Sequence, residues 1–125
     1  MRRRNRFKTI SILLILIVAP TALWAQSATF TLDHNVLNLS GGATVTAAFT
    51  ADYDTTGNLS VYNTAGELIA ALFPASAGNK VNAHQTYSLV WDGKNAAGYK
   101  IAPGIYMFHL NLNLGSYEKR LIVLR

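Results

Sequence analysis

The fold is decided by the stretch "WDGKNAAGYKIAPGIY", residues 91–106. Glycine and proline occupy four of these positions, one aspartate and one asparagine lie among them, and aromatic residues stand at both ends. Such a composition is found in ligand loops, in metal loops and in tight corners between two strands. The sequence on either side discriminates between these three possibilities.

The flanking residues alternate between apolar and polar side chains, which is the pattern of a half-buried strand. Before the stretch, Tyr87, Leu89 and Trp91 share one face, and after it alternate residues from Tyr106 to Leu114 share one face. Between two such strands, a loop rich in glycine and proline indicates a corner where the chain reverses. Further segments with the same alternation are "TFTLD", "ATVTAAFTA" and "NLSVYN", at residues 29–33, 43–51 and 58–63.

One segment, "ELIAALF" at residues 67–73, has no clean alternation. We interpret it as a strand because it is short and follows a turn. Clusters of glycine, asparagine and aspartate separate the segments at the spacing expected between short antiparallel strands. About seven antiparallel strands in about 100 residues, without a helical pattern, predict an all-β fold, namely an immunoglobulin-like sandwich of two sheets.

Each residue type in the corner has a conformational reason to be there. The Asp-Gly pair forms tight turns readily, and the asparagine and glycine that follow tolerate left-handed backbone. The Pro-Gly pair fits the central positions of a type II turn, in which glycine supplies the positive φ. The tryptophan and the tyrosine are apolar anchors, and we expect the indole N–H to reach a backbone carbonyl. The residues to which we assign this structural role are Trp91, Asp92, Gly93, Asn95, Gly98, Pro103, Gly104 and Tyr106.

The first 25 residues have the pattern of a secretory signal peptide. "MRRRNRFK" is a basic region, "ISILLILIVA" at residues 10–19 is an apolar run that we expect to form the signal-peptide helix, and "ALWA" before Gln26 ends in the small residue that a cleavage site requires. An uncleaved anchor is the alternative, but the apolar run is shorter than the about 20 residues that cross a bilayer. We therefore expect an exported domain, residues 26–125, in the periplasm or at the cell surface, with membrane contact only through the signal.

The excess positive charge of the chain lies within this signal. Five of the eleven basic residues lie within residues 2–8, and six basic and six acidic residues remain after residue 25. Because nucleic-acid binding needs clustered lysine and arginine on the folded surface, a domain with no net charge argues against it. The chain has no cysteine, which excludes disulfides, thiolate metal sites and a cysteine nucleophile.

The segment "YSLVWDGKNAAGYKIAPGIYMFHL", continued by "KRLIVLR", closely resembles the FlgD-type immunoglobulin-like domain of exported bacterial proteins. That family's pattern is a tryptophan, Asp-Gly, a polar segment, a glycine, then Gly-x-Tyr and a final strand with basic residues, here Lys119 and Arg120. Upstream, "LSVYNTAGELIAALF" matches the family's hairpin. The resemblance extends from Val45 to Arg125 and implies an immunoglobulin-like module.

Two kinds of protein within this resemblance fit less well. Hook-capping flagellar proteins are exported without a cleaved signal, and C-terminal sorting modules, which share the "PGIY" and "EKRLIVLR" features, follow a large passenger. We therefore expect a non-catalytic module that acts in protein binding or envelope assembly, with another protein or a further copy of itself as partner. The alternative is a sorting or anchoring domain, or an accessory fragment of a larger exported enzyme.

No group of residues has the spacing of a catalytic or metal site. Asp92 and Asn95 lack the alternating oxygen ligands and the closing glutamate of an EF-hand loop, so we interpret Asp92 as a cap of its own turn. Asp52 and Asp54 alternate but have no third carboxylate nearby in the sequence, which leaves a weak cation site as the lesser alternative. We expect no enzyme activity, no cofactor and no metal. The isolated histidines, which we expect to be solvated, are His34, His84 and His109.

The last long alternating segment has a polar side formed by Met107, His109, Asn111 and Asn113. A flat polar side on a terminal hairpin is most often an ordinary solvent-facing sheet. The functional alternative is that this hairpin pairs with another chain by strand addition.

Overall fold

The alternating segments form strands in the computed structural model, which describes residues 27–74 and 78–125. The predicted signal peptide, with its helix and its cleavage position before Gln26, lies outside these residues. The segment without clean alternation is also a strand, which confirms that interpretation. The elements are β1 (Ala28–Leu32), β2 (Val36–Asn38), the 3-10 helix η2 (Leu39–Gly41), β3 (Val45–Ala51), β4 (Thr55–Asn63), β5 (Leu68–Phe73), β6 (Lys80–Val81), β7 (Thr86–Trp91), β8 (Gly104–Leu112) and β9 (Gly115–Leu124).

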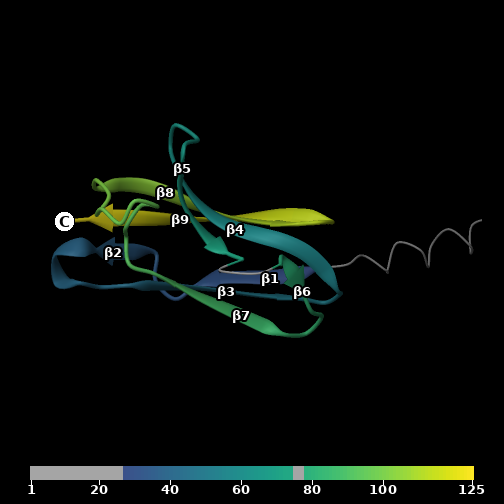
Figure 1. Ribbon diagram of the computed structural model, residues 1–125. Coiled ribbons are helices and arrows are strands. Elements are labelled where there is room, and N and C mark those ends of the chain that lie inside the picture. The colour runs from purple at the N-terminus through teal and green to yellow at the C-terminus, as the bar shows by residue number, and fades with distance from the viewer. Residues whose placement is uncertain (1–26, 75–77) are drawn as a thin grey trace, which may run out of the picture.

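Two sheets pack face to face, as Figure 1 shows. The smaller sheet has the strand order β1-β3-β7, and the larger has the order β2-β9-β8-β4-β5, with β6 paired to β4. The chain crosses between the sheets after β1, after β2, after β3, between β6 and β7, and again between β7 and β8. Such crossings around a shared core are typical of immunoglobulin-like sandwiches. The predicted all-β, two-sheet fold is therefore confirmed.

Three details differ from the prediction. The described residues contain nine strands instead of about seven, because β2 and β6, of three and two residues, are too short to show an alternation. β2 runs parallel to β9, so the pairing is not antiparallel throughout. Leu114 is 64% exposed instead of continuing the core face of β8, because β8 ends at Leu112 and the chain turns there.

Aromatic rings from both sheets meet in the core. Phe49 of β3 stacks on Tyr87 of β7 with ring centroids 5.2 Å apart, and Phe73 of β5 lies edge-on to Phe49 at 5.4 Å. Trp91 lies edge-on to Phe108 of β8 at 5.5 Å. Each such pair contributes about 0.5–1.5 kcal/mol beyond the burial of its area. Phe49 and Tyr87 lie on neighbouring strands of the smaller sheet. The pairs Phe49–Phe73 and Trp91–Phe108 join the two sheets, so these two contacts hold the layers together.

Candidate protein-binding face

The corner between β7 and β8 uses its own polar groups. Trp91 is 3% exposed, and its indole N–H donates to the carbonyl of Lys94 at 2.9 Å, the kind of contact expected from the sequence. Asp92 accepts from the backbone N–H of Lys94 at 3.2 Å. Asn95 Oδ1 accepts from two backbone N–H groups further along the loop, each at 3.0 Å. Because these groups bond within the loop itself, they hold the corner in the shape that carries the chain from one sheet to the other.

Three glycines in the corner have backbone angles that other residues rarely adopt, with φ of +78° at Gly93, +89° at Gly98 and +153° at Gly104. Gly93 is also closely covered, because a Cβ atom there would overlap Cδ2 of Leu39. The expected type II turn at Pro103–Gly104 is wrong. A type II turn needs a φ of about +80° at its glycine, whereas Gly104 is the more extended first residue of β8.

Tyr106 has a specific structural role that the sequence analysis missed. Its side chain is 7% exposed, and its hydroxyl donates to the carbonyl of Ala102 at 2.7 Å. A tyrosine at the start of the strand after an inter-sheet corner, bonded back to the backbone just upstream, is the tyrosine corner of immunoglobulin-like domains. Burial raises the pKa of this hydroxyl above its usual value. The available signal was the position of the tyrosine directly after the corner.

The carboxylates considered as cation ligands serve separate local contacts. Asp52 Oδ2 accepts from Ser27 Oγ at 2.6 Å, and Asp54 Oδ1 accepts from the backbone N–H of Ala83 at 2.8 Å. Within residues 27–74 and 78–125, no three His, Cys, Asp or Glu side chains gather in a way that would hold a metal ion.

The three histidines lie apart and differ in their surroundings. His34 is exposed and its Nδ1 lies 2.9 Å from Asp33 Oδ1, while His84 is an exposed loop residue. His109 is only half exposed, and its Nε2 is buried without a hydrogen-bond partner among the described residues. The expectation of a fully solvated side chain is therefore wrong for His109, whose ring lies 6.1 Å from that of Tyr62 on the neighbouring strand.

Strand addition through the β8–β9 hairpin, the lesser alternative from the sequence, cannot use β8 and is left only the part of β9 before Ile122. β8 pairs with β4 along one edge and with β9 along the other, so it has no free edge. Met107, His109 and Asn111 nevertheless lie on one side of the sheet, while Asn113 belongs to the turn after β8. We call the side of the larger sheet that faces away from the core the outer face.

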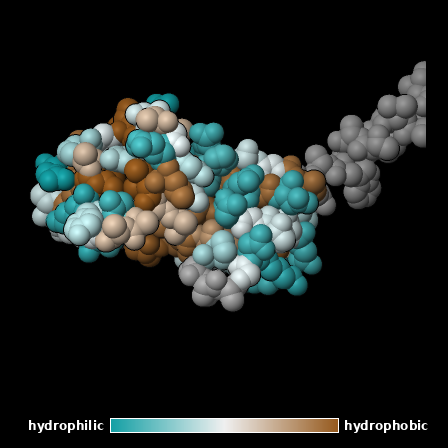
Figure 2. All heavy atoms as spheres, turned by 45° about the horizontal axis from the view of Figure 1, so that its top comes forward, coloured by the Kyte–Doolittle hydropathy of each residue, from teal (hydrophilic) through white to brown (hydrophobic). Residues whose placement is uncertain are grey.

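Exposed apolar side chains gather on this outer face. Val36 of β2, Ile122 of β9 and Ile105 of β8 lie directly opposite one another and are 40–43% exposed; we call these three residues the apolar row. Leu124 on β9 is 46% exposed, and Leu68 on β5 is 58% exposed. Five of the eight large apolar residues that are exposed thus belong to one face. In Figure 2, brown residues cover the half of the molecule where β9 ends, and teal residues dominate the other half.

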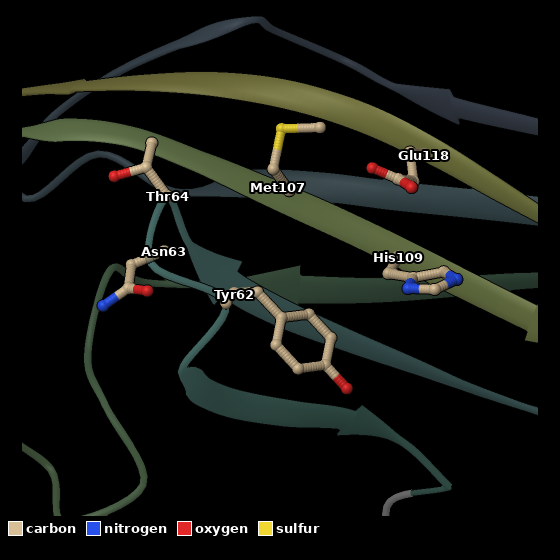
Figure 3. A pocket seen from close by; sticks show the side chains of 7 residues that line it. Tyr62, Asn63, Thr64, Met107, His109 and Glu118 are labelled. Carbon is tan, nitrogen blue, oxygen red and sulfur yellow. The ribbon is translucent and has the colours of Figure 1, made fainter.

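A groove of about 460 Å³ adjoins the apolar row beside the β4–β5 hairpin. Figure 3 shows Tyr62, His109 and Glu118 projecting into it from β4, β8 and β9, with Met107 between the strands. His109 and Glu118 are direct neighbours across β8 and β9. The groove is lined by Tyr62, Asn63, Thr64, Gly66, Met107, His109 and Glu118. An aromatic ring, a thioether and a few polar groups form a surface suited to another protein's side chains.

Comparison with known proteins supports the fold alone. No protein-family model matches the sequence, and no curated protein matches it. Among solved structures, the chain is similar to dimeric latent PorU from Porphyromonas gingivalis, with a TM-score of 0.58 and 18% identity over 82% of this chain. The matched part is 10% of the PorU chain. A second similar structure is the alkylpurine DNA glycosylase AlkC from Pseudomonas fluorescens, bound to DNA containing an abasic site analogue. Its TM-score is 0.45 at 15% identity, and the match covers 83% of this chain and 32% of AlkC. At that TM-score the likeness carries no argument.

The topology, the tyrosine corner and the PorU match together define an immunoglobulin-like β-sandwich. Within the described part of the chain, no helix is both long enough and apolar enough to cross a membrane.

Proposed function

We propose that this protein is an exported, non-catalytic immunoglobulin-like module of the FlgD type that binds protein through the outer face of its larger sheet. It acts in the periplasm or at the cell surface. The proposal of export comes from the signal pattern of residues 1–25, and the FlgD-type resemblance comes from the corner and final-strand motifs.

The observation that carries the binding role is the concentration of exposed apolar residues on one side of one sheet. Single exposed apolar residues are normal on a protein surface, but a contiguous group marks an interaction site. Here the apolar row and its neighbours occupy three adjacent strands, and the groove beside Met107 continues the same surface. The smaller sheet exposes only Val90 among its large apolar strand residues in the described chain.

The same surface supports a role without chemistry. The polar groups in the groove are the Tyr62 hydroxyl, His109, Glu118 and hairpin residues. Nε2 of the histidine has no hydrogen-bond partner among the described residues, so no nucleophile is positioned by it. The corner loop, with its aspartate and asparagine, is held by its own backbone bonds.

A second candidate is an accessory or sorting role within a larger exported protein. The specific observation in its favour is that a similar fold forms only 10% of the PorU chain. In that case the outer face contacts the body of the larger protein and not an independent partner.

Site-specific photo-crosslinking in living cells tests the proposal. A photoreactive amino acid at Ile105 of the full chain reports contacts of the outer face, and the same amino acid at Val90, 63% exposed on the smaller sheet, is the matched control. We expect protein adducts at Ile105 and few at Val90. Equal labelling at both positions, or no adduct at Ile105 and Ile122, would contradict a binding role for this face.

A further inference from the structure

We infer that the outer face binds a second copy of this chain, so that two larger sheets pack face to face about a two-fold axis. This inference rests on the proposed binding role of the face and names its partner. Closed two-fold dimers are the commonest assemblies of soluble proteins, and they join the same patch on both copies. The patch must therefore be complementary to itself in shape, hydropathy and charge.

The composition of the outer face meets the requirement of hydropathy. Its centre carries Met107 and Tyr62 side by side on β8 and β4, with Arg120 opposite Met107 on β9. Methionine, tyrosine and arginine are enriched at protein interfaces, and homodimer interfaces have apolar centres. The apolar row lies next to this centre, because Ile105 and Ile122 are two residues along β8 and β9 from Met107 and Arg120.

The charges of the face are also complementary to themselves. Glu118 and Arg120 lie two residues apart on β9, with side chains on the same side of the sheet. The ion pairs among the described residues join Lys94 to Asp92 and His34 to Asp33, so neither Glu118 nor Arg120 takes part in one. An acidic and a basic group that are neighbours on one strand, each without an ionic partner in the described chain, can both be paired when the face meets a copy of itself.

One placement of the axis satisfies hydropathy and charge together. If the axis runs parallel to the strands, between the two faces and midway between β8 and β9, β9 of each copy lies over β8 of the other. Ile122 then covers Ile105 of the second copy, so apolar row meets apolar row. Arg120 and Glu118 of the second copy are then separated by one strand, about 5 Å across the sheet, and by two residues, about 7 Å along the strands. The two faces themselves lie about 10 Å apart. The combined length of the two side chains spans this separation, and the contact occurs twice.

Pairing through the sheet edge is a less suitable mode. The outer edge of β9 pairs with β2 only from Ile122 to Leu124, so its first part is open among the described strands. Lys119 lies in that part, on the same side of β9 as the buried Leu121. An inward-pointing lysine on an edge strand is a device that opposes strand pairing, and two antiparallel copies centred there would place Lys119 against itself.

Sedimentation of the exported form, recovered after expression of the full chain, tests the dimer. We expect a concentration-dependent dimer that Ile122→Asp shifts to monomer, whereas Val90→Asp, an equivalent change on the other sheet, leaves the dimer unchanged. Far-UV circular dichroism confirms that each variant is folded. A chain that stays monomeric at about 100 μM, a concentration at which a dimer with a micromolar dissociation constant is almost fully formed, would overturn the inference.

A charge-reversal cycle then identifies the two-fold contact. Glu118→Arg and Arg120→Glu should each raise the dimer dissociation constant about tenfold or more, because each turns two attractions into two repulsions. The double variant exchanges the charges on both copies and should restore the dissociation constant to within about threefold of the original. Lys80→Glu, a reversal on β6, which pairs only with the first residues of β4 and lies outside the β8–β9 contact, should have no effect. Single variants without effect, or a double variant weaker than both, would refute this arrangement.

The absence of native cysteine allows an independent check. When Ile105→Cys and Ile122→Cys copies are mixed, a short bifunctional thiol reagent should join one to the other, and a Val90→Cys copy should not react with either. If the chain is monomeric but a different protein is crosslinked at Ile105 in cells, the dimer is refuted and the proposed binding role stands. If neither a copy nor another protein is found, both fail.

Discussion

Replacement of Gly93 by alanine separates two physical costs at the corner. The first cost is the left-handed backbone at φ +78°, which destabilises a residue with a Cβ atom by about 1–2 kcal/mol. The second is the overlap of the new Cβ with Leu39, beneath which Gly93 is packed, and such overpacking typically costs about 1–3 kcal/mol. Together they lower the free energy of unfolding by about 2–5 kcal/mol, against a total of about 5–15 kcal/mol for a native domain.

Two other glycines provide matched controls. Gly98 has φ +89° but open space around it, so Gly98→Ala should lose only the backbone part, about 1–2 kcal/mol. Gly41 has neither a positive φ nor a neighbour within 4 Å, so Gly41→Ala should stay within about 0.5 kcal/mol of the original protein. Urea unfolding followed by circular dichroism measures all three. If Gly93→Ala and Gly98→Ala lose equal stability, Leu39 moves aside at no cost and the steric argument is refuted.

Three further predictions concern the core, the tyrosine corner and export. Trp91→Ala should cost about 3–5 kcal/mol in urea unfolding, because the indole is 3% exposed and packs on Phe108; a loss below about 1 kcal/mol would contradict a core position. Tyr106→Phe should cost about 0.5–1.5 kcal/mol through the lost bond to Ala102. Because burial raises the pKa of Tyr106 in the folded state, its contribution is complete below about pH 10 and is lost as pH rises through the folded pKa. Tyr106→Phe should therefore weaken the alkaline decline of stability, and Tyr99→Phe, at a 71% exposed site, should not. Mass spectrometry of the exported protein should find a first residue at or near Gln26, and an intact Met1 would indicate an anchor instead.

The sequence predicted the parts of the fold that depend on local periodicity and turn chemistry. Alternation places Trp91 and Phe108 in the core, because side chains of a strand point to opposite sides in turn. The polar residues of the corner bond to neighbours within four positions, so their role follows from the local sequence. The prediction that Leu114 continues the buried side of β8 was wrong. The alternating pattern runs on to Leu114, whereas the strand ends at Leu112, where the chain turns.

The class of fold, the corner and the buried sides of the strands could thus be predicted from the sequence, because alternation and turn chemistry are signals within short segments of the chain. Only the tertiary structure decided which strands are neighbours. β2 joins β9 and β4 joins β8 through pairings that connect distant segments. Together with the β8–β9 hairpin, the β4–β8 pairing leaves β8 itself without a free edge. The β2–β9 and β8–β9 pairings also bring Val36, Ile105 and Ile122 into one row. No local pattern marks such a row, because its members are separate apolar residues on three strands until the sheet aligns them.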